Sequence, residues 1–446
     1  MAAIDQTYRY AQPSVLRPSP AGRELALACD TPATDEGPLR FLSARALYPD
    51  VTAKGLRGVS EIVGARYYVP PSMLARILRE ADPVATVSPG AVRFEGFSAC
   101  CSVYARMDLG DGALDVAHRR NGTTNVDFGP ELRAALASVG TDTALELGIG
   151  ADSVDLTRDG ATIVEKKVPL PLRWIKGFAQ VQVVLAEMEP AFTLNRLGAQ
   201  RFLRALPRGK TDHLQWVSVA GGTARLSARE TKGAVPLRGS HRLKVLESLV
   251  ARAHALEVFR NPHTGATAWV LDFETQRFSL VLNVEPWRGF SGDGGVLSRV
   301  ATSDGTAAAT LRAWLNWQDR IDASGLAAST GLPRDAIDGA LAELAATGLV
   351  GFDLAQGGYF HRVLPFDADQ IAALNPRLEA ARALVAAGAV TRSGSDAQVV
   401  SDDVVHRVSP DGDGWRCTCP WFAKTAGQRG PCKHILAVEM FLEANA

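Results

Sequence analysis

The chain lacks several features that would assign it to a familiar class. No apolar run approaches the ~18 residues of a membrane-spanning helix, so we expect no membrane insertion. The formal net charge at pH 7 is zero, so no overall field draws the protein to nucleic acid or to a membrane surface. Nothing at the N-terminus resembles a signal peptide, and only 6 of the 446 residues are cysteine. We therefore expect a cytoplasmic protein in a reducing compartment, without disulfides.

The sequence also lacks a nucleotide-binding loop and a catalytic constellation. Residues 209–211 imitate the end of a phosphate-binding loop, but Arg204 stands where a glycine is required. Asp272 and Glu274 lie two apart on an expected strand, and a solvated strand face is the simpler interpretation of such a pair. No nucleophilic residue and general base occur at a sequence spacing that is typical of a catalytic site. We expect a protein that is not an enzyme; a catalytic site within 40–300 is the remaining alternative.

Half of the cysteines nevertheless fall within residues 415–434, together with one of the 8 histidines. The candidate ligands are Cys417, Cys419, Cys432 and His434. They follow the pattern C-x-C, twelve residues, C-x-H, and three thiolates with one imidazole are the ligand set of a closed tetrahedral zinc site. Pro431 precedes a segment with helical apolar spacing, and a helix N-terminus there would favour the thiolate form of Cys432. The pattern predicts one structural Zn²⁺.

The residues around these ligands resemble the SWIM zinc finger family. The resemblance rests on V-V-H-R-V at 404–408, D-G-W before the first cysteine, C-P-W-F at 419–422 and G-P-C-K-H at 430–434, and it covers roughly 378–443. It implies bound zinc and an interaction role toward DNA or protein. Long bacterial chains with such a C-terminal finger resemble proteins encoded beside MoxR-type AAA ATPases and von Willebrand A proteins. The resemblance therefore implies an adaptor or substrate-recognition role for an ATPase of that kind.

The finger also has an excess of positive charge, because residues 415–434 contain four Lys or Arg and no acid. Two aromatic residues directly follow Pro420, so we expect at least one ring on the surface near these cations. Such a patch suits either stacked bases with phosphates or an acidic, apolar groove on a protein. We favour the protein partner. The residues that we expect at this surface are Trp421, Phe422, Lys424, Arg429 and Lys433.

A second bias covers residues 173–244, which hold thirteen Lys or Arg against four acids. Part of this basic stretch is an expected helix with Arg196, Arg201, Arg204 and Arg208. Trp174 and Trp216 flank it, and a basic surface with aromatics is typical of nucleic-acid binding. The same charge suits an acidic protein partner, or is balanced by acids elsewhere in the domain. Nucleic-acid binding through this stretch and the finger is thus the alternative to a protein-binding role.

The chain as a whole predicts a multidomain α+β fold. We expect a flexible arm over 1–38, a mixed α/β region over 39–300 with a candidate subdomain break near 170–210, a winged-helix-like helical domain over 308–366 and a ββα-type SWIM finger over 375–446. Within the mixed region we also expect helices at 70–80, 128–139 and 241–256. The strands expected over 94–107 carry the adjacent thiols Cys100 and Cys101, which we interpret as packing residues.

The winged-helix expectation rests on three short helical segments followed by a hairpin that turns at Gly357–Gly358. In that superfamily the third helix reads DNA. Here the third helix carries three acids, Asp335, Asp338 and Glu343, against the single Arg334. Because acids at that surface would repel phosphate, we expect a protein-contact or spacer role for this segment.

Overall fold

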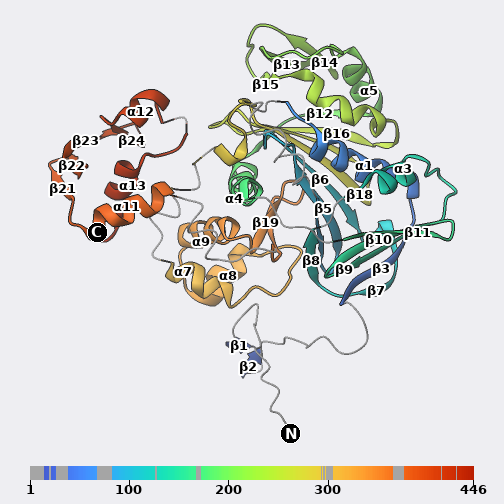
Figure 1. Cartoon of the computed structure of the whole chain (residues 1–446), viewed down its shortest axis with the longest axis horizontal. Helices are drawn as coiled ribbons and strands as arrows, with labels where there is room; N and C mark the ends of the chain where they lie inside the picture. Colours follow the sequence, from blue (N-terminus) through green and yellow to red (C-terminus); the bar gives the residue numbers. More distant parts are fainter. Residues whose placement is uncertain are drawn as a thin grey trace.

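The structure is a computed structural model that describes residues 15–19, 22–26, 39–67, 83–125, 128–166, 172–292, 294, 297, 305–364, 376–412, 414–427 and 429–445. Figure 1 shows a large sheet-based body, a helical unit (orange) against it, and the C-terminal finger (red) beyond. Within the expected arm, β1 (Val15–Ser19) and β2 (Gly22–Ala26) form an antiparallel hairpin. The rest of that arm and the helix expected at 70–80 lie outside the described residues.

Two antiparallel sheets form the large body, with strand orders β12-β16-β17-β18-β6-β5-β4-β8 and β11-β10-β9-β3-β7. The larger sheet contains β4 (Val84–Val87), β5 (Ala91–Phe97), β6 (Val103–Gly110), β8 (Gly122–Asn125), β12 (Glu189–Asn195), β16 (Ala255–Arg260), β17 (Thr267–Asp272) and β18 (Gln276–Leu282). The smaller contains β3 (Arg40–Ala46), β7 (Leu114–Arg119), β9 (Leu145–Gly150), β10 (Ser153–Arg158) and β11 (Ala161–Lys166). Cys100 and Cys101 lie in the turn between β5 and β6, not in a strand as we expected.

Helix α1 (Pro49–Gly64) covers one face of the central strands β5 and β6. A Cβ at Gly55 would lie 2.4 Å from the sulfur of Met107, and a Cβ at Gly58 would lie 2.9 Å from the ring of Phe278. The two glycines therefore let the helix approach the sheet closely. A shorter helix, α3 (Pro130–Ala137), falls inside the segment expected at 128–139.

The opposite face is covered by α4 (Leu172–Ala186). Its Trp174 and Phe178 pack edge-on against Phe97 of β5, with ring centroids 5.9 and 5.0 Å apart. Trp174, which flanks the basic stretch in the sequence, has a completely buried side chain and is no part of a surface. Burial among aromatic neighbours stabilises the indole.

Most of the basic stretch forms a small unit with a sheet of order β14-β13-β15, beside α5 (Arg196–Ala205) in Figure 1. The strands are β13 (Leu214–Ala220), β14 (Thr223–Ser227) and β15 (Val235–Arg238). The α-helix expected at 241–256 is instead a pair of 3₁₀ segments, η3 (Ser240–Ser248) and η4 (Val250–Arg252). The apolar residues of this segment, among them Leu243, Leu246 and Leu249, are nonetheless buried. They are spaced by three residues, which places them on one face of a 3₁₀ helix as well as of an α-helix.

The helical unit has the element order expected for it, a run of three helices and a hairpin. The elements are α7 (Thr306–Arg312), α8 (Ala323–Thr330), α9 (Arg334–Ala346), β19 (Val350–Asp353) and β20 (Gly358–His361). The Asp322 carboxylate accepts the Ser324 N–H and caps α8, as the sequence indicated. After α9 the chain turns at Gly348, whose φ of 74° favours glycine. Whether this unit is a true winged helix stays a prediction.

The C-terminal finger is built on an antiparallel sheet of order β21-β22-β23-β24. Its strands are β21 (Val390–Ser393), β22 (Asp396–Ser401), β23 (Val404–Asp411) and β24 (Gly414–Cys417), and its helices are α11 (Pro376–Ala386), α12 (Pro420–Thr425) and α13 (Lys433–Glu443). The inner side chains of the sheet pack on α13, which buries Ile435 and Val438 as its apolar spacing predicted. The finger thus contains the ββα arrangement β23-β24-α13, together with the helices α11 and α12 and the strands β21 and β22.

Candidate metal centre

Each candidate ligand sits where an element of the finger begins or ends. Cys417 is the last residue of β24, and Cys419 is the N-cap of α12. Cys432 is the N-cap of α13, and His434 lies in that helix's first turn. The sheet and the two helix starts therefore converge on one point, and all four side chains are buried.

The ligand atoms of these four residues all lie within 4.8 Å of one another. The Nδ1 atom of His434 is 3.7 Å from the sulfur of Cys417 and 3.9 Å from that of Cys432. A tetrahedral zinc ion with ordinary Zn–S and Zn–N bonds would place sulfur and nitrogen about 3.6 Å apart. The residues therefore fit Zn²⁺, with His434 binding through Nδ1.

Backbone N–H groups support the sulfur ligands. The Phe422 N–H donates to Cys419 over 3.4 Å, and the Ile435 N–H donates to Cys432 over 3.5 Å, each from the first turn of the capped helix. A hydrogen bond from the Cys417 thiol, with further bonds from His434 and Ile435, lowers the pKa of Cys432, and the same hydrogen bond raises the pKa of Cys417. Donors aimed at a sulfur stabilise the thiolate, which is the form that binds the metal.

One ring packs against the histidine ligand. The ring centroid of His406, in β23, lies 4.1 Å from that of His434, with the two ring planes tilted. Burial lowers the pKa of His406, as does the neighbouring His434. The Nε2 atom of His434 is buried and has no hydrogen-bond partner among the residues that the structure describes. The His406 ring therefore fixes the orientation of the ligand by packing.

The expected interaction surface of the finger is only partly free. Lys424 and Arg429 are exposed, but Lys433 forms an ion pair with Asp402 over 3.3 Å. Trp421 is half-buried, and the Arg377 guanidinium lies 4.8 Å from its ring centroid. Phe422, also half-buried, packs against the core of the finger. Of the five residues expected at this surface, two are cations without an acid partner among the described residues, one is paired and two are partly covered by the finger itself.

Arg377, in α11, also holds the loop that leads to Cys432, because it donates to the carbonyl oxygens of Arg429 and Pro431, each over 2.9 Å. In the same loop, Gly430 has a φ of 73° and lies against Gly294. A Cβ at Gly430 would come within 2.4 Å of the Gly294 carbonyl oxygen, so only glycine fits. Neither contact was predictable from a local pattern, since both depend on how distant segments pack.

The structure divides the basic stretch into buried and exposed residues. Arg242 is buried and donates to three backbone carbonyls, those of Arg238, Asn283 and Ser102. This part of the positive charge is therefore structural. The arginines that we expected on a helix are all exposed, on or just after α5: Arg196, Arg201, Arg204 and Arg208.

A buried ionic cluster, which the sequence did not indicate, joins the hairpin β19–β20 to the central strands. Arg362, just after β20, binds Glu95 of β5 over 2.5 Å, and both side chains are fully buried. Arg106 of β6 donates to the Phe352 carbonyl over 2.8 Å and lies 3.5 Å from Asp353. Burial alone would raise the pKa of Glu95, but the charges of Arg362 and Arg106 outweigh it and lower that pKa. The hairpin is therefore tied to the main core, to which Phe352 also belongs.

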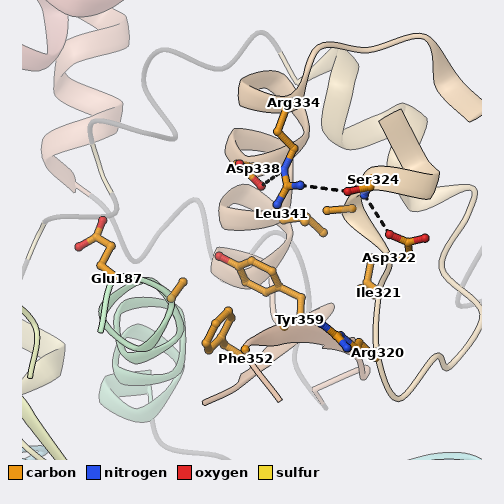
Figure 2. Close-up of a pocket in the computed structure, with 14 residues that line it drawn as sticks. Glu187, Arg320, Ile321, Asp322, Ser324, Arg334, Asp338, Leu341, Phe352 and Tyr359 are labelled. Atoms are coloured by element: carbon orange, nitrogen blue, oxygen red, sulfur yellow. Dashed lines mark hydrogen bonds and ion pairs between the residues drawn. The ribbon is translucent and has the colours of Figure 1, made fainter. Parts of the chain in front are cut away.

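A pocket of about 710 Å³ lies between α8, α9, the hairpin and the end of α4 (Figure 2). Arg334 points across it, and its guanidinium lies 3.1 Å from Asp338 and 3.3 Å from the Ser324 hydroxyl. Tyr359 and Phe352 form the opposite wall. The single cation at the start of α9 is therefore already paired within the protein.

Comparison with known proteins gives one family match. The SWIM zinc finger family matches residues 406–442. No curated protein matches the chain. Within the part of the chain that the structure describes, no helix has the length and apolar character needed to cross a bilayer.

Among solved structures, the PCNA2–PCNA3 complex of Sulfolobus tokodaii is 9% identical, with a TM-score of 0.39, over 54% of this chain and 98% of that one. The proliferating cellular nuclear antigen of Entamoeba histolytica is 9% identical, with a TM-score of 0.37, over 55% of this chain and 99% of that one. At TM-scores this low, neither similarity carries a conclusion about this chain. What the comparisons and the ligand geometry establish together is a C-terminal segment that matches the SWIM zinc fingers and presents their kind of Cys₃His zinc site.

Proposed function

We propose that this chain is a cytoplasmic, non-enzymatic interaction protein whose zinc finger recognises a protein partner. The observation that carries the proposal is the closed ligand set. Four buried protein ligands would occupy all four coordination positions of a tetrahedral zinc ion and leave none for a substrate. A metal in such a site stabilises the fold of the finger and thereby the surface that the finger presents. Three thiolates, a neutral imidazole and Zn²⁺ carry one net negative charge, which the four Lys and Arg of the finger loop outweigh.

The partner that the family resemblance favours is a MoxR-type AAA ATPase or a von Willebrand A protein, for which this chain would act as an adaptor. The partly covered Trp421 suits such a role. A ring already packed by Arg377 is rigid, and rigid aromatic residues serve as anchors in protein interfaces. The exposed Lys424 and Arg429 would then form the polar rim around that anchor.

Nucleic-acid binding is the second candidate, and the exposed arginines of α5 are the observation that favours it. Three other features weigh against it. Trp174 is buried, Arg377 occupies a face of Trp421, and the cation at the start of α9 is paired with Asp338. These features remove Trp174 as a stacking platform, cover part of Trp421 and pair the helix charge that nucleic acid would use, whereas Trp216 stays half-exposed.

The test compares the zinc-loaded full chain with its Cys417→Ala, Cys432→Ala variant in affinity capture from cell extract. We expect one protein to be recovered by the loaded chain and lost with the variant, with identification by mass spectrometry. Recovery of the same proteins by both forms would contradict a role for the finger.

Two further variants separate the partner classes. For a protein partner, Trp421→Ala should weaken binding more than Lys424→Glu with Arg429→Glu, and the affinity should depend weakly on salt. For nucleic acid, the charge reversals should abolish binding, and the affinity for plain DNA should fall steeply between low and physiological salt. A steep salt slope with DNA and no recoverable protein partner would replace the first candidate with the second.

A further inference from the structure

Residues 196–232 form a unit with a large excess of exposed positive charge. Some exposed arginines elsewhere are matched by acids, as in the pairs of Arg40 with Asp155 and Arg407 with Asp396. None of the described acids pairs with the cations of this unit, which has only two acids of its own. The unpaired cations are Arg196, Arg201, Arg204, Arg208, Lys210, Arg225, Arg229 and Lys232.

Helix α5 arranges part of this charge as a stripe. Its buried face consists of Ala199, Phe202 and Leu203, which pack on the small unit's core. Arg201 and Arg204 are one turn apart on the opposite face. Arg196 begins the helix on a neighbouring face and Arg208 follows its end, so exposed cations also lie at both ends of the stripe. From Arg196 to Arg204 the helix rises about 12 Å, which about four residues of extended peptide would match.

The stripe is not purely charged. Leu197 lies one turn before Arg201 on the same face, and 57% of its surface is exposed. It stands at the mouth of a pocket of about 580 Å³ between the start of α5, the start of α1 and the turn after β17. Tyr48, which is 45% exposed, and Phe273 add apolar surface to the lining.

The other basic side chains of this pocket already have acidic neighbours. Arg252 pairs with Asp50 over 3.2 Å, and His254 lies 3.9 Å from Glu274. Arg196 is the lining cation that is free of a described acid. The pocket thus offers a cavity of mixed lining, apolar at Leu197, Tyr48 and Phe273 and polar elsewhere, with one free positive charge at its rim. Further free cations follow along α5.

We infer that this surface binds an acidic peptide segment of a protein partner, with a bulky apolar side chain in the pocket and carboxylates along the α5 stripe. The inference rests on the proposed protein-binding function and gives the chemistry of the partner. Guanidinium groups bind carboxylates through paired hydrogen bonds, and a free cation row complements an acidic segment in charge. A surface that binds only the phosphate backbone of a nucleic acid makes no use of an exposed leucine between its arginines. An acidic peptide with an apolar side chain would use both the arginines and Leu197, so we favour the peptide.

The test uses the full zinc-loaded chain and a library of twelve-residue peptides, each with acidic residues around one variable position. Binding is read by fluorescence polarisation at low and physiological salt. We expect bulky apolar residues to be selected at the variable position. Arg201→Glu with Arg204→Glu should weaken binding at least tenfold for every peptide. Leu197→Ala should weaken only the peptides with an apolar anchor, by about threefold to tenfold.

The matched control is Arg57→Glu with Arg133→Glu, which reverses two exposed helical arginines outside the stripe and should leave binding unchanged. Failure of the library to bind, or equal loss in the control, would overturn the inference. So would tighter binding of a plain DNA duplex that the stripe variant abolishes. The capture experiment keeps the two proposals apart: if a partner is lost with the finger variant but retained with the stripe variant, the proposed function stands and this inference fails.

Discussion

Cys432 combines three roles at a single position. It ends the loop held by Arg377, it caps α13, and it supplies a sulfur to the ligand set. The cap explains the C-x-H spacing, because a ligand at the N-cap and another two residues later both lie at the open end of the helix. Cys419 repeats the arrangement at α12. Two helix starts therefore surround the zinc site with N–H donors, which suits its negative charge.

Loss of two ligands should remove the metal. We expect one zinc per chain in the unaltered protein and none in the Cys417→Ala, Cys432→Ala variant, measured by elemental analysis. Because zinc binding supplies folding free energy to small metal sites, the finger should lose its secondary structure with the metal. The control Cys100→Ala should keep one zinc per chain. Full zinc in the double variant would refute the assigned ligand set.

His361 should make stability depend on pH. It is fully buried, and its Nδ1 atom accepts a hydrogen bond from the backbone N–H of Trp317 over 2.6 Å. Burial lowers the pKa of His361 to about 4. The unfolded chain takes up this proton near its ordinary pKa of about 6.5. Between those values only the unfolded state is protonated, so the stabilising contribution is present above pH 6.5 and is lost as the pH falls toward 4. The full loss is about 3 kcal/mol.

Urea unfolding at pH 7 and pH 5 checks this prediction. The His361→Gln variant keeps an acceptor for Trp317 and should lose less stability between the two values than the unaltered chain does. The exposed His213, replaced in the same way, serves as the control. An identical pH dependence in all three proteins would contradict the role of His361.

At the scale of elements, local signals made some segments predictable and left others hidden. The helix α9 and its hairpin were predictable from apolar spacing and from Gly348 and Gly357. Helix α4 was not, since its run Q-V-Q-V-V at 180–184 alternates in the manner of a strand. It is a helix because packing against β5 and α9 overrides that preference. In α1, Gly55 and Gly58 weaken the helical signal while allowing close contact with the sheet.

The buried pair of Arg362 and Glu95 should tie the hairpin to the sheet. Removing one partner leaves an uncompensated buried charge, so Arg362→Met or Glu95→Gln alone should cost about 3–5 kcal/mol. The double variant should cost clearly less than the sum, with a coupling free energy of at least about 2 kcal/mol from urea unfolding. The exposed pair of Arg382 and Glu379 is the control, with an expected coupling below about 1 kcal/mol. Equal coupling free energies in the two pairs would show that the buried pair does not stabilise the attachment of the hairpin to the sheet.

At the scale of the whole molecule, the sequence indicated the zinc ligands but not the contacts between units. Cys417 and its partners follow a local pattern, whereas the docking of the hairpin depends on Glu95 and Arg362, which are 267 residues apart. The same is true of the finger. One apolar cluster contains Ala179 and Val183 of α4 and Ala342 of α9 together with the buried residues of the finger. Such long-range contacts leave no periodic signal in the sequence.

This shared cluster predicts how the chain responds to loss of the finger. A chain ending at residue 370 should still fold, because the large body and the helical unit have cores of their own. It should nevertheless be destabilised by about 1–3 kcal/mol, since Ala179, Val183, Ala342 and Ala346 would lose apolar cover. Calorimetry should therefore show the main unfolding transition of the truncated chain a few degrees lower than that of the full-length chain.

The full-length Cys417→Ala, Cys432→Ala variant should show the same decrease, because its finger is unfolded and no longer covers these side chains. An unchanged transition in both proteins would mean that the finger contributes nothing to the stability of the rest, and an unfolded truncated chain would mean that the large body depends on it.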